Sequence, residues 1–263
     1  MPMAARSAPT AAAAPSAAKR LVGFLVLFML YQSAEGVGAR WLHSFAIQAS
    51  LMVLALSAAW PVARWLGWRP GWRAYALEPQ GRTWAWLPAG LLIAVALKLA
   101  AVRWGIAAGI YAPATSTAGM AAMLAVLPMA LASTFVPSLA EDILTRGYLL
   151  RASGIAWRRG STFVLASTAL YIANHVYRLQ LGPREWALLA SYGATYAVAV
   201  WRTGSLWPAV GLHWGWNLGN GMADELMPAE TADARSAAWL SMAMHTAMLL
   251  LVVAATRRRP AGA

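Results

Sequence analysis

Three short fragments of the chain place ionisable side chains inside otherwise apolar sequence. The fragments are AEDILTRGYLL, YIANH and HWGWN, and they contain Glu141, Asp142, Arg146, His175, His213 and Asn217. An ionisable group near the centre of a bilayer costs roughly 2.5–3.5 kcal/mol, so it tends to face a partner, a water-filled cavity or a reaction. We therefore take these side chains as candidates for acid–base chemistry.

The first fragment combines two carboxylates with an arginine. Pro137 and Ser138 predict a helix start, with Ser138 as the N-cap. On that helix Asp142 and Arg146 are four residues apart and can pair on one face, while Glu141 points about 100° away. A carboxylate left outside such a pair in a low-dielectric site is suited to base catalysis. The alternative is a charged motif that caps a membrane helix at the interface.

Two histidines lie in later apolar segments at a matching spacing. Tyr171 and His175 are four residues apart, as are His213 and Asn217, so each pair shares one face of a helix. Helices of a bundle can bring such side chains to one internal cavity. A lone histidine in an apolar helix is more often a hydrogen-bonded core residue, and we interpret His245 in that way.

The composition is that of a polytopic membrane protein. Of the 263 residues, 60% are hydrophobic and 11% are charged, and the mean hydropathy is +0.53. Because a membrane helix needs about 20 apolar residues, the sequence predicts an all-α fold, a transmembrane helix bundle of about eight spans. The expected spans are 21–36, 41–60, 84–102, 118–136 continuing to about 151, 161–176, 186–201, 206–222 and 236–256.

The net charge of +12 reflects membrane topology. Most Lys and Arg residues fall in the two tails and in alternate loops, which is the positive-inside pattern and predicts that both termini are cytoplasmic. The acidic loop at 224–235 then faces the opposite side. We expect a multi-pass protein of the bacterial inner membrane, with the lipid bilayer as a partner and no nucleic acid.

The remaining sequence predicts one membrane domain. Residues 1–18, rich in Ala, Pro and Ser, are expected to be a disordered tail, and 19–259 a single transmembrane domain. Trp and Arg residues alternate between 60 and 86, which is typical of the headgroup zone; a basic surface that grips substrate is the alternative. The chain has no cysteine, which excludes disulfides, thiolate nucleophiles and Cys-ligated metals.

Taken in order, the three fragments resemble the motifs of the CAAX protease and bacteriocin-processing family of intramembrane endopeptidases. The family pattern has two adjacent glutamates with an arginine four residues beyond the second, an aromatic residue four before a histidine, and a histidine four before an asparagine. The motifs cover 137–220, and the resemblance implies a membrane domain over most of 20–256. The chain departs from the pattern at Asp142, where glutamate is usual, and at Tyr171, where phenylalanine is usual.

The resemblance implies hydrolysis of a peptide bond by four catalytic residues. Glu141 would activate water, His175 would help to position it, and His213 with Asn217 would stabilise the oxyanion. The expected substrate is a membrane-anchored protein or a C-terminal sorting tail, as in the myxosortase-like branch of the family.

Arg146, Asp142 and Tyr171 are expected to support those four residues. No cofactor or metal is expected, although zinc bound at the same carboxylate and histidines is an alternative, because these side chains are suitable zinc ligands. The alternative function is a non-proteolytic membrane protein, either a proton-coupled transporter or an immunity or binding scaffold, since intramembrane Glu, His and Arg also build proton relays.

Overall fold

Helices account for almost all of the chain that the structure describes. The structure is a computed structural model, and it describes residues 14–68, 71–78, 83–114, 120–155 and 159–256. The α-helices in these ranges are α1 (Ala17–Ser33), α2 (Phe45–Trp65), α3 (Trp86–Ala107), α4 (Met120–Asp142), α5 (Tyr148–Ala152), α6 (Gly160–Asn174), α7 (Pro183–Thr203), α8 (Trp207–Leu226) and α9 (Ala234–Ala255). The predicted all-α helix bundle is therefore confirmed.

Two wider π-helical segments, Ala34–Trp41 and Ile143–Gly147, extend α1 and α4. Short 3₁₀ turns occur at Gly71–Tyr75, Thr83–Ala85 and Val176–Leu181. The first two turns lie in the Trp-rich segment expected at the headgroup zone. The disordered tail expected at 1–18 lies largely outside the described residues. Helix α1 begins within that range, at Ala17. Ser16 caps it, because its side chain accepts a hydrogen bond from the backbone N–H of Lys19.

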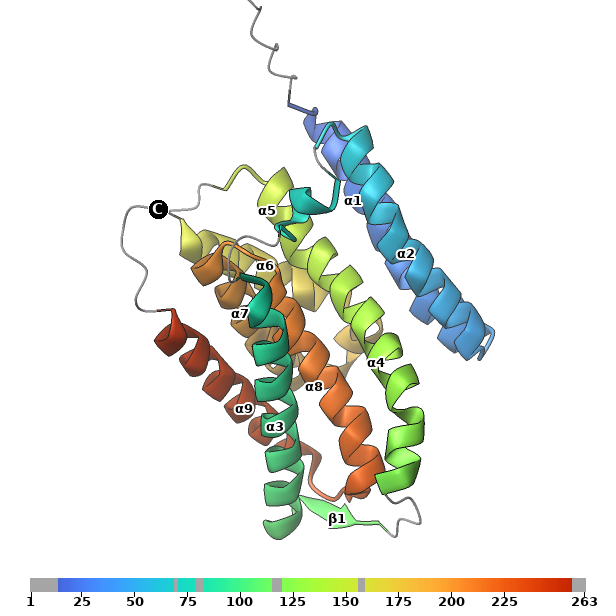
Figure 1. The fold of residues 1–263 in the computed structure, drawn as a ribbon, viewed down its shortest axis with the longest axis vertical. Helices are drawn as coiled ribbons and strands as arrows, with labels where there is room; N and C mark the ends of the chain where they lie inside the picture. Colours follow the sequence, from blue (N-terminus) through green and yellow to red (C-terminus); the bar gives the residue numbers. More distant parts are fainter. Residues whose placement is uncertain (1–13, 69–70, 79–82, 115–119, 156–158, 257–263) are drawn as a thin grey trace, which may run out of the picture.

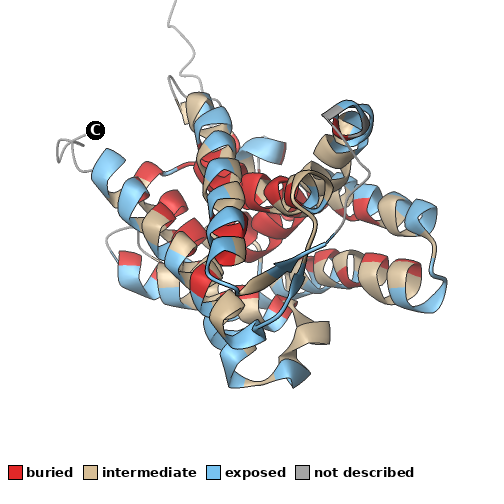
Figure 2. Cartoon of the chain, turned by 90° about the horizontal axis from the view of Figure 1, so that it is seen from below, coloured by how far each residue is buried: buried red, intermediate tan, exposed pale blue. Residues whose placement is uncertain are grey.

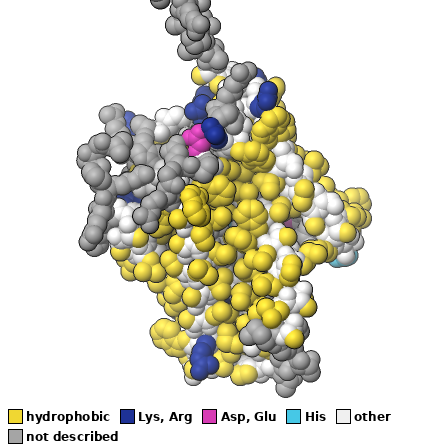
Figure 3. All heavy atoms as spheres, in the orientation of Figure 1, with side chains coloured by type: hydrophobic (Ala, Val, Ile, Leu, Met, Phe, Trp, Pro, Cys, Tyr) yellow, Lys and Arg dark blue, Asp and Glu magenta, His cyan; other side chains and the backbone are white. Residues whose placement is uncertain are grey.

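Five helical stretches in the described ranges are long and apolar enough to cross a membrane. They are Ala17–Trp41, Phe45–Trp65, Thr83–Ala107, Met123–Ala152 and Ala234–Ala255. The surface agrees, because hydrophobic side chains cover most of the face shown in Figure 3. The spans expected at 161–176, 186–201 and 206–222 correspond to α6, α7 and α8, which are not among the five. The multi-pass character is supported, and the number of eight spans stays a prediction.

The predicted helix start at Pro137 is wrong. Both Pro128 and Pro137 lie inside α4, and Ser138 is an interior residue whose hydroxyl donates to the backbone carbonyl of Thr134, 2.7 Å away. Proline is tolerated within membrane helices because side chains and neighbouring helices satisfy the exposed backbone groups. Trp214 on α8 donates its indole N–H to the carbonyl of Leu131 at 3.2 Å, which links this stretch of α4 to α8. One continuous helical segment therefore carries the first motif.

Glycines allow α8 to pack closely against α3. A Cβ atom added at Gly215 would lie 2.4 Å from the carbonyl oxygen of Leu91, and one at Gly211 would lie 2.4 Å from that of Leu87. Gly90 on α3 makes the reciprocal close approach to α8. Small residues let membrane helices approach backbone to backbone, so this glycine seam fixes α8 in the centre of the bundle.

The helices surround α8 on several sides. Figure 1 shows α8 between α3 and α4, with α1 and α2 side by side at one edge of the bundle. Buried residues concentrate in the interior of the bundle (Figure 2), and α7 and α8 carry many of them. At the end of the bundle away from the N-terminus, the short strands β1 (Tyr111–Pro113) and β2 (Ala229–Thr231) pair antiparallel, which the sequence did not predict. This pairing ties the loop after α3 to the loop after α8.

Candidate active site

Glu141 lies at the centre of a buried polar cluster that three other segments complete. The residue is 4% exposed. Nδ1 of His175 lies 3.6 Å from Oε1 of Glu141, and Nε2 of His213 lies 3.7 Å from Oε2. These distances are longer than direct hydrogen bonds but suit ion pairing when an imidazole is protonated. The structure thus brings together three residues that the sequence placed on separate helices.

Asp142 and Arg146 form the predicted pair one turn apart, and both residues are fully buried. Oδ1 of Asp142 accepts from Nη1 of Arg146, and Nδ1 of His213 lies 3.5 Å from the same carboxylate oxygen. Asp142 therefore faces the His213 ring on the nitrogen opposite to the one near Glu141. Each ring nitrogen of His213 thus faces a carboxylate, Nδ1 that of Asp142 and Nε2 that of Glu141.

Arg146 is held between two aromatic rings. Its guanidinium carbon lies 4.9 Å from the ring centre of Tyr171 and 5.1 Å from that of Tyr196. Nε and Nη2 of Arg146 have no hydrogen-bond partner in the described part of the chain. The faces of the two rings stabilise the buried cation there, because an aromatic face attracts a cation by about 0.5–2 kcal/mol. Tyr171 and Tyr196 thus both contact the Arg146 guanidinium through their ring faces.

His175 lies just beyond the last helical residue of α6, so the predicted helix ended two residues too late. Its backbone angles, φ −86° and ψ 52°, are not helical, and the backbone turns there into the 3₁₀ segment. Nδ1 of His175 lies 2.8 Å from the carbonyl oxygen of Tyr171, which can only accept a hydrogen bond. Nδ1 therefore carries the proton, and Nε2 is left as the acceptor of the neutral ring.

Three polar residues that the sequence analysis did not select complete the surroundings of Glu141. Nδ2 of Asn174 donates to Oε1 of Glu141 at 3.2 Å, and the hydroxyl of Tyr31 donates to Oε2 at 3.1 Å. The amide of Gln32 in turn donates to Oδ1 of Asn174 at 2.9 Å and to its backbone carbonyl at 2.6 Å. The sequence did contain a signal that could have identified these residues, because Tyr31, Gln32 and Asn174 are polar residues in apolar helices.

Asn217 is on the α8 face that looks towards α4, one turn beyond His213. Its Nδ2 donates to Oγ of Ser138 at 3.0 Å, and Ser138 precedes Glu141 by three residues on α4. Asn217 therefore lies one helical turn from His213 of the cluster. Its amide donates to Ser138 and not to the carboxylate of Glu141. His245, by contrast, is a fully buried core residue with hydrogen bonds to Tyr196 and Ser241, as expected.

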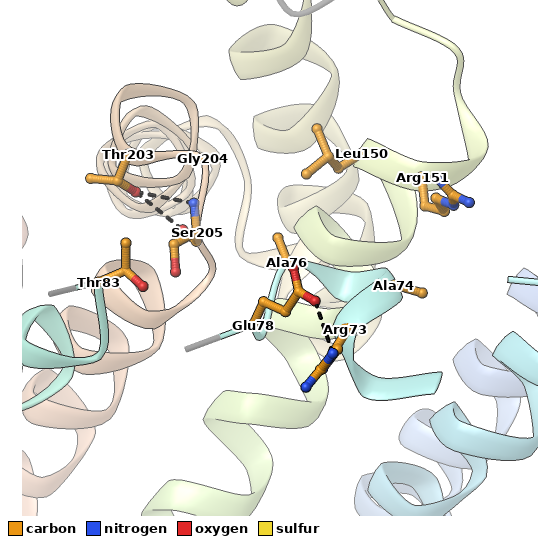
Figure 4. A pocket seen from close by; sticks show the side chains of 10 residues that line it. All are labelled: Arg73, Ala74, Ala76, Glu78, Thr83, Leu150, Arg151, Thr203, Gly204 and Ser205. Atoms are coloured by element: carbon orange, nitrogen blue, oxygen red, sulfur yellow. Dashed lines mark hydrogen bonds and ion pairs between the residues drawn. The ribbon is translucent and has the colours of Figure 1, made fainter. Parts of the chain in front are cut away.

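A separate polar cavity lies at the end of the bundle near the N-terminus of α8. Its volume is about 300 Å³, and Figure 4 shows Arg73 beside Glu78, with Thr203 and Ser205 opposite. None of the residues predicted from the three motifs lines it. Among the described residues, no group of three or more His, Asp or Glu side chains has the arrangement of a metal site.

Comparison with protein-family models finds a match over the segment that carries these residues. Residues 123–219 match the family model described as type II CAAX prenyl endopeptidase Rce1-like. Neither the curated proteins nor the solved structures contain a significant match to the chain. The matched segment spans all three motifs, and the family implies CAAX-type protease activity in a membrane. The resemblance predicted from the motifs is thereby confirmed: the segment that carries them is Rce1-like, consistent with the CAAX protease and bacteriocin-processing family.

Proposed function

We propose that this protein is a glutamic endopeptidase that hydrolyses a peptide bond of a membrane-anchored protein or C-terminal sorting tail. The observation that carries the proposal is the position of Glu141, a buried carboxylate with an imidazole within 4 Å of each oxygen. A general base must lie within reach of the proton that it takes and must be oriented by its neighbours. Asn174 and Tyr31 orient this carboxylate.

In the proposed reaction Glu141 removes a proton from water, and the resulting hydroxide attacks the carbonyl carbon of the scissile peptide bond. The free Nε2 of His175 accepts a hydrogen bond from that water and so directs it. The tetrahedral intermediate carries a negative oxygen. When it collapses, the C–N bond breaks, and the proton held by Glu141 passes to the leaving amine. The products are a new carboxylate and a new amine.

His213 and Asn217 are assigned to the oxyanion. Donors aimed at the charge that develops in the transition state contribute strongly in a site that excludes water. His213 would donate through Nε2, the ring nitrogen that faces Glu141, while Nδ1 faces Asp142. Asn217 has a second amide hydrogen besides the one donated to Ser138, which is available to an oxyanion.

A proton relay is the competing interpretation of the same residues. A proton-coupled transporter would use Glu141 to exchange protons without hydrolysing a peptide bond, and an immunity or binding scaffold would need no proton transfer. Nothing in the family match favours either. Zinc bound by the carboxylate and histidines is the competing mechanism, which we do not favour because the family resemblance points to water activated directly by the glutamate.

The test begins with the substrate. Membrane and secreted fractions of cells with and without the protein are compared for peptides with new termini, and the purified protein in liposomes is then given the candidate substrate. We expect cleavage at one position, loss of turnover in His175→Ala and His213→Ala, and a lower kcat with little change in KM in Asn217→Ala.

The matched control is Glu225→Gln, which alters a carboxylate in the last turn of α8 and should leave cleavage unchanged. Exhaustive chelation should also leave activity intact. Activity that is lost to a chelator and restored stoichiometrically by zinc would overturn the metal-free mechanism. If no peptide with a new terminus depends on the protein in any fraction, the endopeptidase assignment is overturned.

A further inference from the structure

We propose that His245 on α9 is a positioning residue that fixes the ring of Tyr196 and, through that ring, the imidazole of His213. The proposal rests on the proposed peptidase function. His245 lies outside the three motifs, and its contacts with the site run through Tyr196 on α7.

The hydrogen bonds of His245 determine which nitrogen carries the proton. Nδ1 lies 2.9 Å from the backbone carbonyl oxygen of Ser241, which can only accept, so Nδ1 donates. Nε2 of the neutral ring is then an acceptor, and the hydroxyl of Tyr196, 3.1 Å away, donates to it. Because His245 is 0% exposed, bulk water does not compete for that hydroxyl hydrogen bond.

The Tyr196 ring is placed by this hydrogen bond against two residues of the site. It stacks on the His213 imidazole with ring centres 5.0 Å apart and an angle of 21° between the planes. Its face also lies 5.1 Å from the guanidinium carbon of Arg146. Movement of the Tyr196 ring would therefore shift the nitrogen of His213 that faces Glu141.

His245 is itself immobilised on both sides. Its ring stacks on that of Tyr192 with ring centres 3.7 Å apart. It makes a T-shaped contact with Trp216, with ring centres 4.4 Å apart. Its backbone carbonyl accepts from the hydroxyl of Thr195 at 3.0 Å. Because these contacts with α7 and α8 hold the His245 ring in place, its Nε2 is a fixed hydrogen-bond acceptor for the Tyr196 hydroxyl.

A pair of matched substitutions separates positioning from packing. In His245→Gln the side-chain oxygen takes the place of Nε2 and can still accept from Tyr196, whereas in His245→Asn the shorter amide keeps the donor to Ser241 and cannot reach Tyr196. We expect kcat to fall roughly two- to tenfold in His245→Asn with KM unchanged, and to stay within about twofold in His245→Gln. Tyr196→Phe should match His245→Asn, and the double variant should be no worse than either. Thr246→Val, an exposed neighbour on α9, is the neutral control.

A second measurement does not depend on activity. With isotope-labelled histidine in the resting protein, the ring signals of His213 should shift in His245→Asn and Tyr196→Phe and stay in place in His245→Gln. Equal losses of kcat in the Gln and Asn variants, or unshifted His213 signals in His245→Asn, would overturn the positioning role. If the wild-type protein cleaves nothing, the peptidase assignment fails, while the ring signals still decide whether His245 positions His213.

Discussion

Asn174 donates a hydrogen bond of 3.2 Å to Oε1 of Glu141, so the residue before His175 holds the candidate base. The same asparagine accepts from Gln32, which connects α1 to the carboxylate through one side chain. A hydrogen bond to a charged group is worth more than a neutral one, about 1.5–3 kcal/mol. Glu141 is therefore oriented by an amide on α6 as well as flanked by two imidazoles.

The first prediction tests this amide. Asn174→Asp keeps the shape of the side chain but places a second carboxylate against Glu141, and like charges at this distance disfavour the ionised base. We expect kcat to fall at least roughly tenfold, with folding retained. Cleavage kinetics of the purified variant measure this. The control is Gln180→Glu, the same chemical change at an exposed position, and equal activity in both variants would remove Asn174 from the site.

The second prediction concerns the buried ion pair. Asp142→Ala leaves the Arg146 charge buried without its carboxylate, which should cost about 3–5 kcal/mol of unfolding free energy as well as activity. Asp142→Glu keeps the charge and should retain much of the activity. Denaturant unfolding in detergent measures the stability. Glu35→Ala is the control, because it breaks a pair with Arg40 whose side chains are 40% and 48% exposed, and it should cost about 1 kcal/mol or less. A stable, fully active Asp142→Ala protein would contradict this account.

The third prediction concerns the seam between α3 and α8. Gly215→Ala forces a methyl group against the Leu91 backbone and should destabilise the protein by about 1–3 kcal/mol. Gly221→Ala on the same helix meets nothing within 4 Å, and the higher helix propensity of alanine should leave stability equal or slightly increased. Thermal unfolding of both variants measures the difference. Equal stability of the two variants would mean that α8 is not fixed by close backbone packing.

The fourth prediction concerns topology. The distribution of Lys and Arg predicts an even number of spans with both termini cytoplasmic. Reporter fusions at residue 263 and within the 224–235 loop should therefore report opposite sides of the membrane. Reporters on the same side would show that the predicted topology is wrong.

The parts of the fold predicted from sequence are those that depend on local patterns. Long apolar stretches separated by charged loops predict membrane helices, and the four-residue spacing of Asp142 and Arg146 predicts their pair, because helical geometry alone brings them together. The prediction at Pro137 failed because proline, which favours a helix start in water, is tolerated in the interior of a membrane helix such as α4.

The parts not predicted depend on contacts between distant segments. The bond from Tyr31 to Glu141 joins residues 110 apart, and the bond from Asn174 joins residues 33 apart. No periodicity in a single segment specifies such contacts. The three motifs could still be recognised, because each is defined by a four-residue spacing within one short segment, and the family match covers all three.

The central claim is that Glu141 activates the water that cleaves the substrate, and single-turnover kinetics of Glu141→Gln test it most directly. Glutamine has nearly the same shape but cannot take a proton from water, so the cleavage step should slow by roughly 10²–10⁴-fold while the substrate dissociation constant stays unchanged. Wild-type protein mixed with the same labelled substrate should cleave it in the first turnover. Cleavage by Glu141→Gln at the wild-type rate, with binding intact, would contradict the account.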